Sequence, residues 1–263
     1  MVPAAPELQP AADAASHSRG RIFLSTEWRD LLMLNYEIDP VVLHPFVPSG
    51  TELDSFEGKT YVSLVGLRFA RTRLFGSISV PFHTDFDEVN LRIYVRRSEA
   101  GELRRGVVFI REIVSLPLVT LAARTAYGEN YMTLPLRHSI SLTGSGGSVE
   151  YSWEYRRQPY RMRSLTSGSG SRANEGSLEQ FISEHYWGYT RRHDGSSLEY
   201  YVSHDPWRIW RAANVTFEGD GAGIYGAELG RVLARAPDSA FIADGSPVLV
   251  FAGNKIRRPS SQR

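Results

Sequence analysis

The sequence predicts a β-rich α+β protein, made mostly of antiparallel strands with a few short helices. Short apolar or alternating segments recur along the chain, and turn signals such as Glu57-Gly58 and Asp194-Gly195 separate them. Stretches with helical features are few and brief. The chain has 263 residues, of which 42% are hydrophobic, and this is ample for a self-sufficient core.

The domain organisation follows from composition. Residues 1–20 mix Ala, Pro and polar residues without a periodicity that could bury a face, so we expect a disordered leader. One domain is expected over about residues 21–250. Residues 251–263 contain Lys255, Arg257 and Arg258 and are expected to form a basic tail.

Five segments have the apolar or alternating pattern of strands. They are residues 60–69, 89–95, 107–114, 148–155 and 198–203. In a strand, successive side chains point to opposite faces, so such segments suit a sheet that buries at least one face. Their spacing predicts a mostly antiparallel sheet.

Three stretches have helical features: residues 40–46, 117–127 and 177–184. Asp39 can cap the first, which has proline at its first helical position. The second also begins with proline, is rich in alanine and ends at Gly128, a residue that favours helix ends. In the third, Ser177 stands three residues before Gln180, which is the spacing of a capping box.

Composition excludes several classes of function. The net charge is +1, from 30 basic and 29 acidic residues, so no general field attracts nucleic acid or an anionic membrane. No apolar run reaches the roughly 18 residues that span a bilayer, and we expect a cytoplasmic protein. Cysteine is absent, which excludes disulfides, thiolate metal sites and a cysteine nucleophile. We expect no cofactor and no metal, and the sequence leaves the oligomeric state open.

Six motifs together carry a family resemblance. They are residues 28–36, 45–54, 61–66, 88–97, 106–112 and 184–189. On these motifs the chain resembles the YqjF-like family of uncharacterised proteins from about Arg21 to Trp210. That family is similar to the acetoacetate decarboxylase-like superfamily. The resemblance therefore implies an antiparallel barrel or cone with an internal cavity for a small molecule.

The same resemblance implies that the decarboxylase chemistry is missing. In the decarboxylases a strand ends in Arg-Glu, and Pro-Lys-Lys follows after four residues, its first lysine forming the Schiff base. Here Arg111-Glu112 is followed at that spacing by Pro117, but Leu118 and Val119 stand in place of the two lysines. Neither side chain supplies the amine that imine formation requires.

The chain has two lysines in all. Lys59 lies in a turn and Lys255 in the basic tail, so both are expected to be solvated instead of facing a cavity.

Three residues are candidates for catalysis. Glu88 stands where the Tyr-x-Glu strand of the decarboxylases places a carboxylate in the pocket, so the resemblance implies a cavity position for it. With Arg111 and Glu112 it could form a cluster that binds a carboxylate or enolate and moves protons. The alternative is an internal ion-pair network that only fastens strands.

Two knots of aromatic and titratable residues supply candidate ligand contacts. The first contains His185, Tyr186 and Trp187, and the second contains His204. If both line one pocket, a histidine could act as a general base beside aromatic walls. The alternative is that the rings pack in the core and that each histidine is held by a hydrogen bond.

Three functions remain open on sequence alone. The chain could bind a small carboxylate or carbonyl compound without Schiff-base chemistry. It could be a lyase, hydratase or isomerase that uses a carboxylate or histidine for proton transfer. It could also be a structural or interaction protein whose cavity is filled by its own aromatic side chains.

Overall fold

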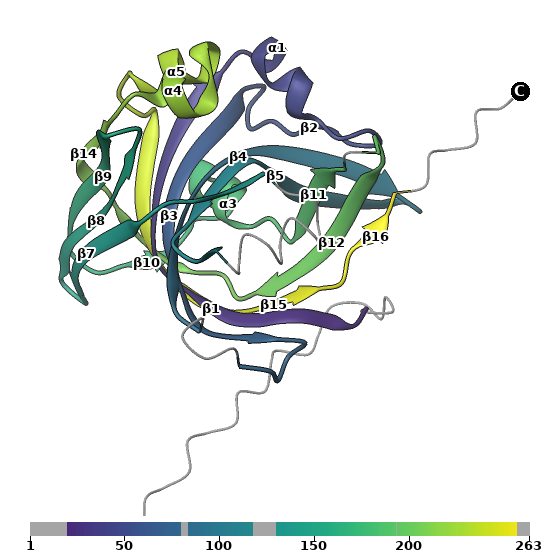
Figure 1. The fold of residues 1–263 in the computed structure, drawn as a ribbon, viewed down its shortest axis with the longest axis horizontal. Helices are drawn as coiled ribbons and strands as arrows, with labels where there is room; N and C mark the ends of the chain where they lie inside the picture. The colour runs from purple at the N-terminus through teal and green to yellow at the C-terminus, as the bar shows by residue number, and fades with distance from the viewer. Residues whose placement is uncertain (1–19, 80–83, 118–129, 193, 257–263) are drawn as a thin grey trace, which may run out of the picture.

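The computed structural model describes residues 20–79, 84–117, 130–192 and 194–256 (Figure 1). Several expectations lie outside these ranges. They are the leader up to residue 19, the predicted helix after Pro117, the pair Leu118 and Val119, and residues 257–263 of the predicted basic tail. The tail was expected from residue 251, but Phe251 ends β15 and residues 254–255 form β16, so the sheet extends further than predicted.

The described residues form two sheets. The larger contains β1 (Ile22–Ile38), β2 (Glu52–Leu53), β3 (Thr60–Leu74), β4 (Phe86–Glu99), β5 (Glu102–Val114), β6 (Tyr131–Thr133), β10 (Ser171–Arg172), β11 (Trp187–Arg191), β12 (Ser197–His204), β13 (Arg208–Arg211), β15 (Ser239–Phe251) and β16 (Asn254–Lys255). The smaller contains β7 (Leu136–Thr143), β8 (Gly146–Tyr155), β9 (Gln158–Ser167) and β14 (Ala213–Glu218), in the order β14-β9-β8-β7. The five predicted strands lie within β3, β4, β5, β8 and β12.

The larger sheet closes on itself. Its order runs β15-β1-β3-β4-β5-β11-β12, and β12 pairs again with β15, where Val202 faces Val250 and His204 faces Val248. Most of these pairings are antiparallel, and the short β5–β11 pairing is parallel. Closure satisfies the backbone groups that an open edge would expose and creates an inner face separated from solvent.

The strands of the ring bury both of their faces. Outward residues such as Leu64 on β3 and Leu91 on β4 pack against Tyr151 and Trp153 of the smaller sheet. Figure 1 shows that sheet lying against one side of the ring. Inward residues form a second core that includes Phe181 of the helix α3 (Leu178–Ser183). Because both faces are covered, successive side chains along a strand alternate between the outer core and the inner core, and not between core and solvent.

The helices follow the predicted caps, with two additions. Asp39 accepts a hydrogen bond from the backbone N–H of Val41 at the start of α1 (Pro40–Leu43), which a 3₁₀ turn (His44–Phe46) extends. Ser177 caps α3 by accepting from the N–H of Gln180. Two helices were not predicted, α4 (Gly221–Tyr225) and α5 (Ala227–Leu233). They pack closely on each other, since a Cβ on Gly230 would lie 2.4 Å from the backbone nitrogen of Ala222.

Contact between the two sheets depends on a glycine. A Cβ added to Gly66 of β3 would lie 2.4 Å from the ring of Tyr151, which is fully buried and has no space to move into. We expect Gly66→Ala to lower the free energy of unfolding by roughly 1–3 kcal/mol, as overpacking of a core does. Urea unfolding checks this value. The control is Gly144→Ala, whose Cβ would meet nothing within 4 Å, and equal stability of the two variants would contradict the packing argument.

Candidate functional site

The ring encloses a cavity of about 180 Å³. Most of its wall is apolar and includes the rings of Trp28, Phe69, Phe86, Phe109 and Trp207. Engineered apolar cavities of about 150 Å³ hold a benzene molecule, so this space suits a small organic molecule. A few polar side chains break the apolar wall, which is the usual character of a small-molecule site.

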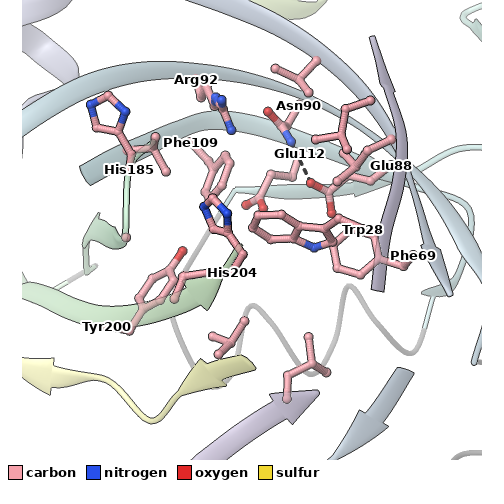
Figure 2. Close-up of a pocket in the computed structure, with 18 of the residues that line it drawn as sticks. Trp28, Phe69, Glu88, Asn90, Arg92, Phe109, Glu112, His185, Tyr200 and His204 are labelled. Atoms are coloured by element: carbon pink, nitrogen blue, oxygen red, sulfur yellow. Dashed lines mark hydrogen bonds between the residues drawn. The ribbon is translucent and has the colours of Figure 1, made fainter. Parts of the chain in front are cut away.

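Three of these polar groups come from one strand. Glu88, Asn90 and Arg92 occupy alternate positions of β4, so all three point to the inner face and line the cavity. Between them, Val89 and Leu91 point outward into the core against the smaller sheet. Figure 2 shows the three polar side chains in sequence order along the strand.

Arg92 places a buried guanidinium at the cavity wall, with 7% of the residue exposed. Its Nη2 donates to the carbonyl of Ile182 at 3.0 Å, and its Nε makes a long 3.4 Å contact to the hydroxyl of Tyr94. Both partners are neutral. Within the part of the chain that the structure describes, no carboxylate lies within 4.0 Å of this guanidinium. A buried positive charge without an ion-pair partner favours an anionic ligand.

Asn90 and Glu88 are joined by a hydrogen bond. The Nδ2 of Asn90 donates to Oε1 of Glu88 at 2.8 Å. The Oδ1 of Asn90 is buried and accepts no hydrogen bond from the described residues. The strand therefore presents a buried acceptor between a carboxylate and a guanidinium (Figure 2).

The predicted cluster of Glu88, Arg111 and Glu112 is only partly assembled. Glu112 pairs across β5 with Asn90 and lines the cavity together with Glu88. Arg111 does not line it. A register shift between Leu91 and Arg92 leaves Ile110 without a counterpart on β4, so Ile110 and Arg111 share the outer side of a β-bulge.

The expectation for Arg111 was therefore wrong in its placement. Adjacent residues on a strand point to opposite faces, so Arg111 and Glu112 cannot both face one cavity. The charge of Arg111 instead acts on the hydroxyl of Tyr225, which is buried in the outer core. Arg92 supplies the guanidinium that was expected from Arg111.

His185 lies at the cavity wall, beyond Arg92 in Figure 2, and only 2% of its side chain is exposed. Its ring packs against Tyr94 and Phe181, with centroid distances of 4.9 and 5.3 Å. Neither ring nitrogen has a hydrogen-bond partner among the described residues. Burial lowers the pKa of His185 to about 4, so the imidazole is neutral at pH 7.

Asp54 connects this histidine to the protein surface. Its Oδ2 lies 3.8 Å from Nε2 of His185, which is too long for a direct hydrogen bond, and accepts from Nε of Arg105 at 2.7 Å. Burial alone would raise the pKa of Asp54. Its polar contacts with His185 and Arg105 and the charge of Arg105 outweigh burial and hold the pKa at about 2.

The other predicted ligand contacts are divided. His204 and Trp187 line the cavity. Tyr186 does not, and its ring packs on His204 with a centroid distance of 4.9 Å. His204 also stacks on Trp207 at 4.7 Å, and burial lowers the pKa of its imidazole.

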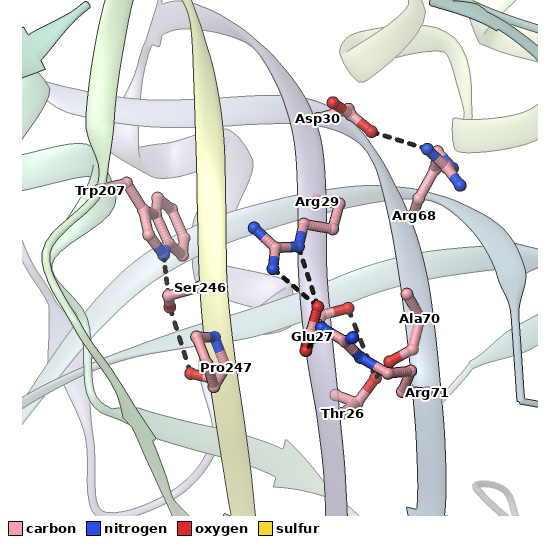
Figure 3. A network of polar contacts seen from close by, with 10 residues as sticks. All are labelled: Thr26, Glu27, Arg29, Asp30, Arg68, Ala70, Arg71, Trp207, Ser246 and Pro247. Carbon is pink, nitrogen blue, oxygen red and sulfur yellow. Dashed lines mark hydrogen bonds and ion pairs between the residues drawn. The ribbon is translucent and has the colours of Figure 1, made fainter. Parts of the chain in front are cut away.

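Polar contacts fix part of the aromatic wall from outside. The indole N–H of Trp207 donates to Oγ of Ser246 at 3.0 Å, as Figure 3 shows. In the same figure Glu27 of β1 pairs with Arg29 and Arg71 beside the register shifts between β1 and β3. These contacts hold the strands that carry the wall residues and leave the cavity itself free of them.

Neither lysine reaches the cavity. Lys59 is exposed and pairs with Glu37 at 2.8 Å, and Lys255 is exposed and pairs with Asp194 at 3.2 Å. Lys59 lies at the predicted turn, whereas Lys255 lies in β16, which pairs with β12, and not in a tail.

Two further classes of site find no support in the ranges that the structure describes. No three His, Asp or Glu side chains gather there as a metal ion would require. None of the helices in those ranges has the length and apolar character needed to cross a bilayer.

Sequence reasoning missed Asn90, Arg92 and Asp54. A signal for the first two was present, because Glu88, Asn90 and Arg92 alternate with Val and Leu along a strand. The polar face of an alternating strand is normally expected to be exposed to solvent. Here the closure of the ring turns that face inward. Asp54 carried no such signal, since its contact with His185 joins residues far apart in the chain.

Comparisons with known proteins agree with this geometry. Residues 25–247 match the family model DUF2071, described as an uncharacterised conserved protein. The uncharacterised protein YqjF of Bacillus subtilis is 23% identical over 188 residues, which are 70% of this chain and 74% of that protein. These matches confirm the family resemblance.

Solved structures resemble the fold along nearly the whole chain. An acetoacetate decarboxylase from Legionella pneumophila superposes with a TM-score of 0.65 at 12% identity, covering 97% of this chain and 98% of its own. The enduracididine biosynthesis enzyme MppR complexed with pyruvate gives a TM-score of 0.60 at 14% identity, covering 96% and 98%. At such low identity these structures confirm the predicted fold class and leave activity open.

The buried histidine predicts a dependence of stability on pH. The unfolded chain protonates His185 near its ordinary pKa of 6.5, and the folded chain only near 4, so the unfolded state binds more protons between these values. We expect the free energy of unfolding to fall, by roughly 3 kcal/mol at most, as the pH drops from 6.5 to 4. His204 adds a contribution of the same sign.

Urea unfolding at pH 7 and pH 5 measures this effect. The variant His185→Leu should show a smaller loss than the wild type, because it has no imidazole to protonate. The control His44→Gln, at an exposed position, should keep the wild-type loss. An unchanged loss in His185→Leu would contradict the assignment.

Proposed function

The chain belongs to the DUF2071 family of uncharacterised conserved proteins, and we propose that it binds a small organic carboxylate in the barrel cavity without Schiff-base chemistry. Arg92 carries the proposal. Its guanidinium is buried at the cavity wall, the hydroxyl of Tyr94 and the carbonyl of Ile182 that it contacts are neutral, and a carboxylate would supply the missing negative charge.

The surroundings of Arg92 support this choice of ligand. His185 is neutral at pH 7 and so does not compete with the guanidinium for an anion. The aromatic wall suits an apolar body attached to the carboxylate. The structure of MppR was solved with pyruvate, a small carboxylate, and this agrees with the class proposed here.

The absence of Schiff-base chemistry follows from the two lysines. Both amines lie on the surface in ion pairs, so no lysine amine is available at the cavity wall to attack a carbonyl carbon. This supports a ligand held by non-covalent contacts.

One observation favours an enzyme as the second candidate. Glu88 and Glu112 line the same cavity as Arg92, from neighbouring strands. A carboxylate next to a bound anion could remove or return a proton at the carbon beside it, as lyases, hydratases and isomerases require. The variant Glu112→Gln separates the two functions. If the protein is an enzyme, this variant should lose catalytic turnover of the ligand. If the protein only binds the ligand, its affinity for the carboxylate should change by no more than a few fold.

A filled cavity was the third possibility. The space of about 180 Å³ persists beside the aromatic side chains of the inner wall. It argues against a barrel that its own rings fill completely.

The proposal predicts that carboxylate binding depends on Arg92. We expect Arg92→Leu to weaken the binding of isocaproate, an aliphatic carboxylate of suitable size, by at least about tenfold, since a charge-assisted hydrogen bond contributes roughly 1.5–3 kcal/mol. Isothermal titration calorimetry measures the affinity.

The matched control is Arg111→Leu, which removes a guanidinium from the opposite face of the neighbouring strand. It should leave the affinity unchanged, and thermal unfolding of both variants verifies that they are folded. Equal affinities of wild type and Arg92→Leu would refute the role of Arg92.

A further inference from the structure

We propose that the ligand carries a hydroxyl group next to its carboxylate, so that the cavity is a site for small apolar hydroxycarboxylates. This inference rests on the proposed carboxylate site and specifies its substrate class. It is carried by the polar face of β4, where Asn90 stands between Glu88 and Arg92.

The orientation of the Asn90 amide is fixed by its neighbour. The Nδ2 of Asn90 donates to Oε1 of Glu88 at 2.8 Å, so the amide nitrogen is the atom turned toward this carboxyl group. The Oδ1 is thereby directed away from Glu88, toward the side of the strand where Arg92 lies (Figure 2).

This oxygen needs a donor. The Oδ1 is buried and has no hydrogen-bond partner among the described residues. The neighbouring guanidinium of Arg92 does not donate to it and instead contacts the hydroxyl of Tyr94 and the carbonyl of Ile182. An unsatisfied buried acceptor costs roughly 1–3 kcal/mol. A ligand that supplies a donor at this point recovers that free energy.

A carboxylate alone cannot supply the donor, and neither can a ketone. A hydroxyl can donate to Oδ1 of Asn90 and accept from a guanidinium at the same time. On alternate positions of one strand, Asn90 and Arg92 are separated by about 7 Å, a span that a hydroxyl and an adjacent carboxylate can cover together. In this arrangement Asn90 accepts a hydrogen bond from the hydroxyl, and Arg92 binds the carboxylate.

The rest of the ligand is apolar. The apolar part of the cavity wall includes Trp28, Leu31, Phe69 and Trp207. These side chains offer no second set of polar groups for a dicarboxylate. A compact branched or aromatic body fits the volume of about 180 Å³.

A matched series of ligands tests the inference on the wild-type protein. Isocaproate, α-ketoisocaproate, α-hydroxyisocaproate and leucine share one carbon skeleton and differ only at the carbon next to the carboxylate. We expect calorimetry to show that α-hydroxyisocaproate binds about tenfold more tightly than isocaproate or the keto acid. The variant Asn90→Leu should lose the preference for the hydroxy acid over isocaproate.

The outcomes separate this inference from the proposed function. Equal affinities for isocaproate and the hydroxy acid, both lost in Arg92→Leu, would overturn the hydroxyl inference and leave the carboxylate site standing. Tightest binding of leucine would overturn it as well, because the donor would then be an ammonium group. No binding of any of the four would overturn both. The ligand comparison uses the wild type, so it stands even where Asn90→Leu fails to fold.

Discussion

Burial of the Arg92 guanidinium is the interaction on which the account of this protein depends. Taking such an ion out of water costs several kcal/mol unless hydrogen bonds or negative charge compensate. Here the compensation consists of one carbonyl, a long contact to a tyrosine hydroxyl and the face of the Tyr94 ring at 5.6 Å. The folded protein therefore keeps a positive site that an anion in the cavity would stabilise. Binding of an anion would explain why the fold keeps a buried guanidinium despite its cost in stability.

Closure of the ring is what makes that burial unavoidable. The outward residues of β4, such as Val89 and Leu91, seal the core against the smaller sheet. Because side chains alternate along a strand, Glu88, Asn90 and Arg92 must then face the interior of the ring. Neighbouring strands surround them with aromatic rings and leave a cavity instead of a packed core. The apolar outer face of β4 thus supports the fold, and its polar inner face forms the site.

The sequence was sufficient for five of the strands, the caps at Asp39 and Ser177 and the overall fold class, because alternation and capping are local signals. It was insufficient for α4, where Gly221 and Gly223 disfavour a helix, and for α5, which has seven residues and is too short to be stable without tertiary packing. In the site, Glu88 and Glu112 line the cavity, and their role in catalysis stays a prediction. Arg111 does not line it, because a β-bulge and strand alternation turn it outward. The polar face of β4 could be read as buried only once the ring was known to close.

A carboxylate site of this kind should already hold its ligand in the protein as cells make it. Native mass spectrometry of the freshly purified chain, with Arg92→Leu purified in parallel, measures this occupancy. We expect a small organic acid that is released from the wild type only on unfolding and is absent from the variant. A bound compound without an acidic group, or the same adduct on Arg92→Leu, would contradict this expectation.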